Sequence, residues 1–72
     1  MPLVEVKAIK GVFSAEQKQD VIERMTDVLV DVEGEYMRPV TVVLFEEISS
    51  GDWGIGGNAL TTQDVHALKA GA

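Results

Sequence analysis

The sequence predicts an α+β fold: a β-α-β unit with parallel strands, followed by a short C-terminal β-hairpin or turn, that assembles through its sheets into an oligomer. Three patterns support this prediction. Residues 2–9 alternate apolar with polar side chains, residues 15–33 carry apolar side chains at helical spacing, and residues 40–46 are β-branched and apolar. The chain has 72 residues, so we expect one domain over residues 1–72. Strands joined through a helix in about 45 residues are expected to lie parallel.

The first strand and the first helix have clear boundary signals. Alternation predicts a strand over residues 2–9, and the pair at 10–11 ends it with a glycine. Ser14 and Gln17 have capping-box spacing, so the helix should begin near Ala15, and Gly34 is placed to end it. One buried helical stripe is expected from six apolar residues: Val21, Ile22, Met25, Val28, Leu29 and Val32.

The second strand is expected over residues 40–46, after a loop of about five residues. Pro39 favours extended backbone before it, so the helix should stop short of this proline. The second strand is apolar on both faces, as in strands that are covered on both sides. A single helix can cover only one face of a two-stranded sheet. The other face therefore requires another chain, which predicts the oligomer.

The remainder of the chain is predicted to form a turn and a short helix. Four glycines in residues 51–57 predict a tight turn or hairpin that packs Trp53 against a neighbour. Residues 61–68 are compatible with a short helix capped by Thr62. Glu46 and Glu47 are adjacent in the second strand, so they should face opposite sides of the sheet and mark its solvent edge.

Composition excludes several classes of function. Twelve Asp and Glu against six Lys and Arg give a net charge of −6, which disfavours nucleic acid and anionic membranes as partners. Without Cys and with one His, neither a disulfide framework, a thiolate metal site nor a zinc site of the usual kind is expected. The longest apolar run, residues 42–45, is far too short to span a bilayer, and no secretory signal is recognisable. We therefore expect a soluble, cytoplasmic protein.

Pro2 is the first candidate for chemistry. Inside a chain, a proline at the start of a strand is simply a residue without a donor. Removal of Met1, which a proline in second position permits, would leave a secondary amine at the terminus. Burial or nearby cations can lower the pKa of such an amine toward neutrality, where a general base works best. A retained Met1 would make the nitrogen a non-basic amide.

Other candidates carry weaker signals. The glycine-rich block fits neither phosphate-binding pattern, G-x-x-x-x-G-K-[ST] or G-x-G-x-x-G. Trp53 fits burial at a subunit interface, the wall of an apolar pocket, or both. His66 has no acid and nucleophile arranged around it in the sequence, which favours a solvated histidine.

Taken together, these features resemble the short-subunit tautomerase superfamily, typified by 4-oxalocrotonate tautomerase. The resemblance covers nearly the whole chain and rests on four places: the Met-Pro start that leads directly into a strand, the glycine turn followed by Ser14-x-Glu16-Gln17-Lys18, the apolar second strand, and Gly51-x-Trp53-Gly54-Ile55-Gly56-Gly57. The combination is far more specific than any one motif.

The resemblance implies a cofactor-independent enol–keto isomerase that acts on a small enol or oxo acid. It also implies a hexamer built as a trimer of dimers, with active sites at subunit interfaces; a homo-oligomer is expected, and a hetero-oligomer is the alternative. In the family the terminal proline is the general base, a role that falls to Pro2. Trp53 would help to form the apolar wall that keeps the pKa of the amine low.

The sequence departs from the family at two substrate-binding arginines, whose positions correspond to Val12 and Val42. Three explanations follow. Arg38, or Lys10 near the turn, supplies a relocated cation; the substrate is less anionic than a dicarboxylate; or the chain is a non-catalytic or partner-dependent subunit. The predicted function is therefore a tautomerase, with a subunit of the same fold without its own activity as the alternative.

Overall fold

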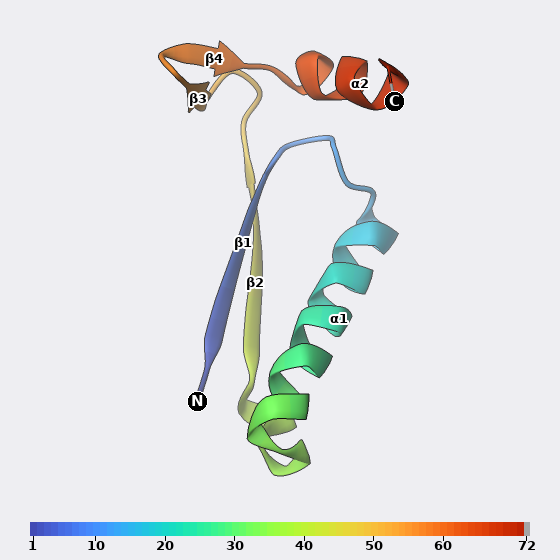
Figure 1. Cartoon of the computed structure of the whole chain (residues 1–72), viewed down its shortest axis with the longest axis vertical. Helices are drawn as coiled ribbons and strands as arrows, with labels where there is room; N and C mark the ends of the chain where they lie inside the picture. The colour runs from blue at the N-terminus through green and yellow to red at the C-terminus, as the bar shows by residue number, and fades with distance from the viewer. Residues whose placement is uncertain (72) are drawn as a thin grey trace.

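The structure, a computed structural model, describes residues 1–71 and has the predicted α+β fold (Figure 1). Its elements in chain order are β1 (Leu3–Ile9), α1 (Ala15–Glu33), the 3₁₀ helix η1 (Glu35–Val40), β2 (Val42–Ile48), β3 (Trp53–Ile55), β4 (Asn58–Leu60) and α2 (Thr62–Gly71). Strands β1 and β2 form a parallel sheet, and β3 and β4 form an antiparallel hairpin. The β-α-β unit and the C-terminal hairpin are both confirmed.

Helix α1 lies along one side of the β1–β2 sheet (Figure 1). On that side Val6 pairs with Phe45, and both side chains are half-buried. Phe13, in the turn before α1, meets Phe45 edge to face with ring centroids 5.5 Å apart, a favoured aromatic geometry. The side of the sheet that faces α1 is thus covered by one helix and one aromatic contact.

Both ends of α1 are formed as predicted. Ser14 accepts a hydrogen bond from the Gln17 amide at 3.1 Å, and the Gln17 side chain accepts one from the Ser14 amide at 2.9 Å. Gly34 ends the helix at φ 109°, and its amide donates to the carbonyl of Val30 at 2.8 Å. A Cβ at Gly34 would stand only 2.8 Å from the Tyr36 ring. Glycine is therefore required here by conformation and by space.

The predicted apolar stripe of α1 is wrong in part. Val30, which was not in it, is buried, whereas Val28 and Val32 are 56% and 87% exposed. The predicted set contains residues of two neighbouring stripes. Residues three apart and residues four apart both fall on roughly the same side of a helix, so the spacing alone does not separate the stripes. One stripe faces the sheet. The second, called here the outer stripe, is largely uncovered and consists of Val21, Met25, Val28 and Val32.

The segment between α1 and β2 also differs from the prediction. Instead of a loop it forms η1, which contains Pro39, and β2 begins at residue 42 rather than 40. The single proton of the Thr41 hydroxyl is shared between two acceptors, the Met37 carbonyl at 2.8 Å and the Glu33 carboxylate. These local hydrogen bonds hold a tight turn where sequence patterns indicated extended chain.

Helix α2 is longer than predicted and is capped by a different threonine. The Thr61 hydroxyl accepts from the Asp64 amide at 3.2 Å, and the Asp64 carboxylate accepts from the Thr61 amide at 2.9 Å. The Thr61 amide, and after it the Thr61 hydroxyl, lower the pKa of the Asp64 carboxyl. Thr62 instead donates its hydroxyl to the Lys10 carbonyl at 2.6 Å, and its amide donates to the Ser50 hydroxyl at 2.9 Å. Thr62 therefore attaches α2 to the turn after β1.

A single protomer leaves much apolar surface uncovered. Its radius of gyration is 15.0 Å, whereas a compact chain of this length has about 11 Å. Its accessible surface is 5267 Å², whereas a compact monomer of this mass exposes about 4,400 Å². Within residues 1–71, only Ile9 and Val30 are buried. On the sheet face opposite α1, Leu3 and Leu44 remain about half exposed. No helix in the described chain is long and apolar enough to cross a membrane.

Glu46 and Glu47 face opposite sides of the sheet as predicted, but Glu47 does not mark a solvent edge. It is half-buried on the α1 side, where it pairs with Lys18 and accepts from the Gly11 amide at 3.1 Å. These two hydrogen bonds, and more weakly Lys10, hold the pKa of Glu47 below its ordinary value. The carboxylate thus joins β2, the turn after β1 and α1.

Replacement of Glu47 by glutamine should lower the thermal stability at pH 7. Because the pKa of Glu47 in the folded chain lies below the usual 4.5, its contribution is present above about pH 4.5 and is lost as the pH falls through the lower folded value. The variant should therefore lose less stability on acidification than the parent. Thermal unfolding at pH 7 and pH 4 measures this, with Glu46→Gln as the control because its ion pair with Lys7 is exposed. Equal pH dependence of the parent and Glu47→Gln would contradict the assignment.

Candidate active site

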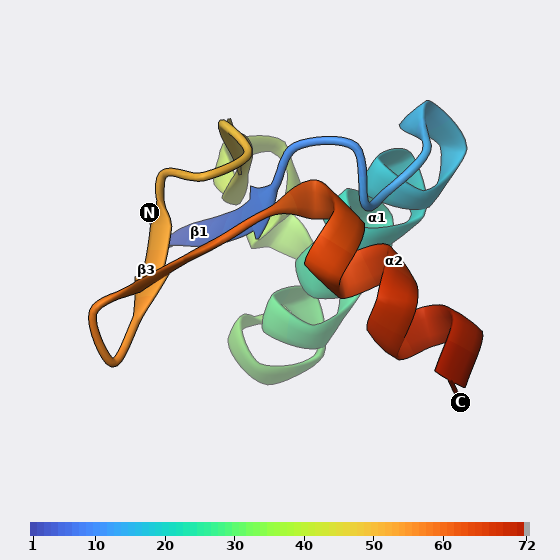
Figure 2. The same ribbon diagram turned by 90° about the horizontal axis from the view of Figure 1, so that it is seen from above.

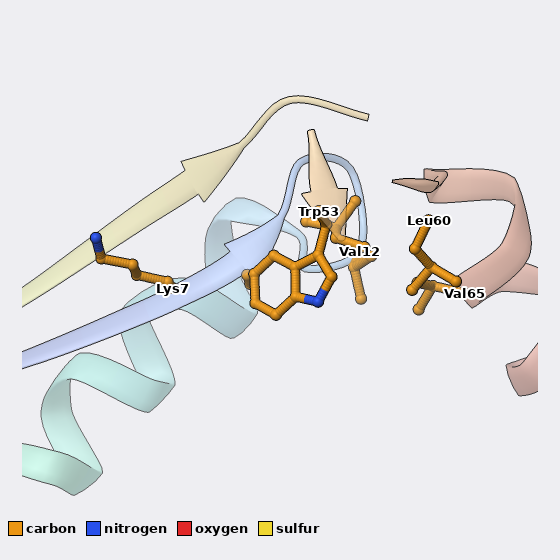
Figure 3. A pocket seen from close by; sticks show the side chains of 7 residues that line it. Lys7, Val12, Trp53, Leu60 and Val65 are labelled. Carbon is orange, nitrogen blue, oxygen red and sulfur yellow. The ribbon is translucent and has the colours of Figure 1, made fainter. Parts of the chain in front are cut away.

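The structure contains an open pocket of about 270 Å³ at the carboxyl end of β1 (Figure 3). Its walls come from β1, the turn after it, the hairpin and α2. The lining residues are Lys7, Ala8, Ile9, Val12, Trp53, Leu60 and Val65. Apart from Lys7 all of them are apolar, so the pocket suits an uncharged organic group.

Trp53 is positioned by the hairpin. It pairs with Leu60 across β3 and β4, and the Gly51 amide donates to the Leu60 carbonyl at 3.0 Å. The hairpin turns at Gly56 and Gly57, with φ of 58° and 83°, a conformation that glycine adopts without strain. In Figure 1 the hairpin and α2 lie beyond the carboxyl ends of β1 and β2, and in Figure 2, seen from above, they lie in front of the sheet and α1. The glycine-rich block is thus a hairpin, as predicted, and it holds Trp53 half-buried over the end of β1.

The turn after β1 places Val12 in the pocket. Gly11 has φ 87°, and a Cβ there would lie 3.2 Å from the Thr62 methyl group. The turn is closed by the Val12 amide, which donates to the Ile9 carbonyl at 3.4 Å. Val12 occupies the position where the resemblance implies an arginine, so this wall of the pocket is apolar.

Lys7 is a lining residue that sequence reasoning did not find. Its ammonium lies 3.5 Å from the Glu46 carboxylate, and the two side chains are 52% and 60% exposed. The available signal was its two-residue spacing from Ile9, which puts both on one face of β1. That face becomes a pocket only because the hairpin folds over it.

Pro2 lies at the other end of the sheet. Its carbonyl accepts from the Val42 amide at 3.0 Å, which fixes its backbone to the start of β2. Met1, before it, is 85% exposed. Lys7 is the pocket residue of β1 that comes first after Pro2, and the five residue steps between the two span about 17 Å of strand; Figure 1 shows the N-terminus at the end of the sheet away from the hairpin. One protomer therefore does not bring Pro2 and Trp53 together.

Arg38 lies in η1, immediately before β2, at the Pro2 end of the sheet. Its guanidinium donates to Glu35 at 2.7 Å and to Asp27 at 2.9 Å. These pairs lower the pKa of Glu35 and raise that of Arg38. The cation thus already has two carboxylate partners within its own protomer. Val42, the second family arginine position, lies in the same region of the sheet.

The remaining candidates lie outside the pocket lining. Lys10 follows β1, and its carbonyl accepts from Thr62, as described above. His66 is exposed on α2. Neither side chain is among those that surround Trp53.

Comparison with known proteins identifies a family over most of the chain. The family model described as tautomerase enzyme matches residues 2–63. A probable tautomerase of Dickeya dadantii is 39% identical over 67 residues, which cover 93% of this chain and 98% of that protein. A probable tautomerase of Campylobacter jejuni is 38% identical over 72 residues, which cover 100% of this chain and 97% of that protein.

Solved structures show the same fold. A 4-oxalocrotonate tautomerase isozyme from Methylibium petroleiphilum superposes with a TM-score of 0.70 at 25% identity, covering 89% of this chain and 97% of that one. A 4-oxalocrotonate tautomerase homologue superposes with a TM-score of 0.73 at 24% identity, covering 82% of this chain and 90% of that one.

Substitution of Gly11 by alanine should destabilise the turn that carries Val12. The positive φ costs an alanine about 1–2 kcal/mol, and the added Cβ presses on Thr62, which attaches α2. Gly54→Ala is the matched control, because Gly54 has an ordinary φ and a Cβ there meets nothing within 4 Å. Denaturant midpoints at one protein concentration compare the two. Equal midpoints would show that the turn tolerates a side chain.

Proposed function

The chain belongs to the tautomerase family, and from this membership we propose a cofactor-independent enol–keto isomerase of small 2-hydroxy or 2-oxo acids that uses Pro2 as its general base. The observation that carries the proposal is the position of Pro2 next to an exposed Met1, with its backbone held by β2. Removal of Met1 would leave a secondary amine at a fixed place. We expect the enzyme to be cytoplasmic.

The proposed reaction needs only proton transfer. The neutral Pro2 amine takes the enol hydroxyl proton and becomes an ammonium, while the electron pair moves into the conjugated system. The ammonium then returns a proton to carbon, which gives the oxo acid and restores the amine. No atom is gained or lost. An amine that is neutral near pH 7 is required, and apolar surroundings favour that form because burial disfavours the charged one.

We propose that the site is completed between protomers. Since Pro2 and the Trp53 pocket lie at opposite ends of one sheet, Trp53 would wall the amine of a neighbouring copy. The open face of the sheet and the outer stripe of α1 offer apolar surface for such contacts. This supports the homohexamer, a trimer of dimers, that the family resemblance implies.

A second candidate is a subunit of this fold without its own activity. The observation that favours it is the apolar nature of residues 12 and 42, where the family resemblance implies arginines. Arg38 could replace one of them at the Pro2 end, but a substrate carboxylate would have to displace Glu35 or Asp27. Activity that depends on Pro2 separates the two candidates.

Replacement of Pro2 by alanine should lower the rate of phenylenolpyruvate ketonisation by about 100-fold or more, the usual contribution of a positioned general base. The assay needs protein whose intact mass shows that Met1 has been removed. Pro39→Ala, which replaces the other proline of the chain, is the control and should retain activity. If processed protein is inactive, or if its activity does not depend on Pro2, the proposed mechanism is wrong.

Introduction of a charge at Val28 should weaken assembly. This side chain is exposed in the protomer, and its burial against a neighbour is worth roughly 2 kcal/mol. Val28→Asp should therefore shift the mass measured by light scattering toward smaller species. Gln19→Asp adds the same charge at an exposed polar position of α1 and should not shift it. An unchanged mass for both variants would place the outer stripe outside the interface.

A further inference from the structure

Lys7 is the one charged residue that lines the Trp53 pocket within the described chain. Its aliphatic stem runs along the pocket, and Figure 3 shows its nitrogen at the end away from the indole. Lysine commonly lays its stem on apolar surface while its ammonium stays near water. The pocket therefore has an apolar interior beside Trp53 and a cation at its margin. Its volume of about 270 Å³ suits a small organic acid.

The partner of Lys7 can be replaced by a ligand. In a single protomer the Lys7–Glu46 pair is long, at 3.5 Å, and both side chains are more than half exposed. Exposed pairs of this kind hold their partners weakly. A ligand carboxylate that reaches Lys7 from the apolar side would form a charge-assisted hydrogen bond in less water, which makes that bond stronger.

Glu46 also limits how much charge the ligand can carry. The strand register fixes its backbone opposite Lys7, so its carboxylate stays near Lys7 even after a ligand has replaced it as the partner of the ammonium. A second carboxylate on the ligand would meet Glu46 without a further cation in the lining, in a chain of net charge −6. Like charges at this distance repel, and a desolvated, unpaired carboxylate is costly.

We infer that the pocket selects a monocarboxylic acid with a planar apolar tail, with the tail against Trp53, the carboxylate on Lys7, and Glu46 excluding a second carboxylate. The tail is recognised by the indole and by aliphatic walls such as Leu60 and Val65. This inference rests on the proposed function for the chemistry of the substrate, but binding to the pocket needs no proton transfer. It can therefore be tested separately.

Trp53 is the only tryptophan, so its fluorescence reports on the pocket directly. Three unreactive probes test the inference on the full-length, assembled protein: 3-phenylpropionate, benzylmalonate, which adds one carboxylate, and 3-phenylpropanol, which has none. We expect 3-phenylpropionate to bind most tightly, and only the binding of the two acids to weaken as salt is raised. Equal binding of 3-phenylpropionate and benzylmalonate, or of the acid and the alcohol, would overturn the inference.

Variants of Lys7 test whether its ammonium binds the carboxylate of the probe. Lys7→Met keeps the stem and removes the ammonium, so 3-phenylpropionate should bind about tenfold more weakly, as expected for loss of a hydrogen bond to a charged group. Lys7→Arg should restore most of the binding. Arg24→Met removes a cation from exposed α1 and is the control. Equal affinities of Lys7→Met and Arg24→Met for 3-phenylpropionate would overturn the role of Lys7. If Lys7→Met fails to assemble, the salt dependence and the comparison with 3-phenylpropanol in the parent decide whether a cation binds the carboxylate.

The exclusion by Glu46 has its own test. Glu46→Gln should improve benzylmalonate binding several-fold relative to 3-phenylpropionate, while Glu23→Gln, on exposed α1, should change neither. An unchanged ratio in Glu46→Gln would overturn the exclusion. Activity assays on the processed parent separate the two proposals: probe binding that depends on Lys7, in a parent without any tautomerase activity, would refute the proposed function alone. Activity that depends on Pro2 without a Lys7 effect would refute this inference alone.

Discussion

A parallel sheet of two strands with one covering helix has an open face, and most other features of this protein depend on that constraint. The open face carries Leu3 and Leu44 about half exposed, together with the Lys7–Glu46 pair. Only Ile9 and Val30 are buried within residues 1–71, so one protomer has very little core of its own. Because a chain of this size buries little surface alone, stability and chemistry are both expected to belong to the assembly.

The C-terminal segment turns the end of the sheet into a pocket through a few hydrogen bonds. Thr62 bonds the Lys10 carbonyl and the Ser50 hydroxyl, and Gly11 leaves just enough space for its methyl group. These contacts bring together segments about fifty residues apart in the sequence. These contacts help to bring Trp53 and Val12 to one pocket.

The parts of the fold that sequence predicted well are those with local signals. Ser14 and Gln17 form a capping box wherever a helix begins after them, and alternation in β1 depends only on neighbouring residues. The outer stripe of α1 could not be separated from the buried one, because helical periodicity does not distinguish a face buried in the protomer from one left uncovered. Thr61 and Thr62 were similarly ambiguous as caps. Lys7 could not be assigned to a pocket because the hairpin that covers it comes from distant sequence.

The proposed site has to keep the Pro2 amine neutral near pH 7 without the two arginines that the family resemblance implies. An amine stays neutral near pH 7 when burial or nearby cations lower its pKa. Lys18 and Arg38 are engaged by carboxylates within the protomer, and positions 12 and 42 are valine. Two means are left to keep the Pro2 amine neutral: burial against the apolar wall around Trp53, and the Lys7 ammonium at the margin of the same pocket. The same wall favours an apolar substrate, so in this proposal a loss of arginines changes specificity and leaves the base usable.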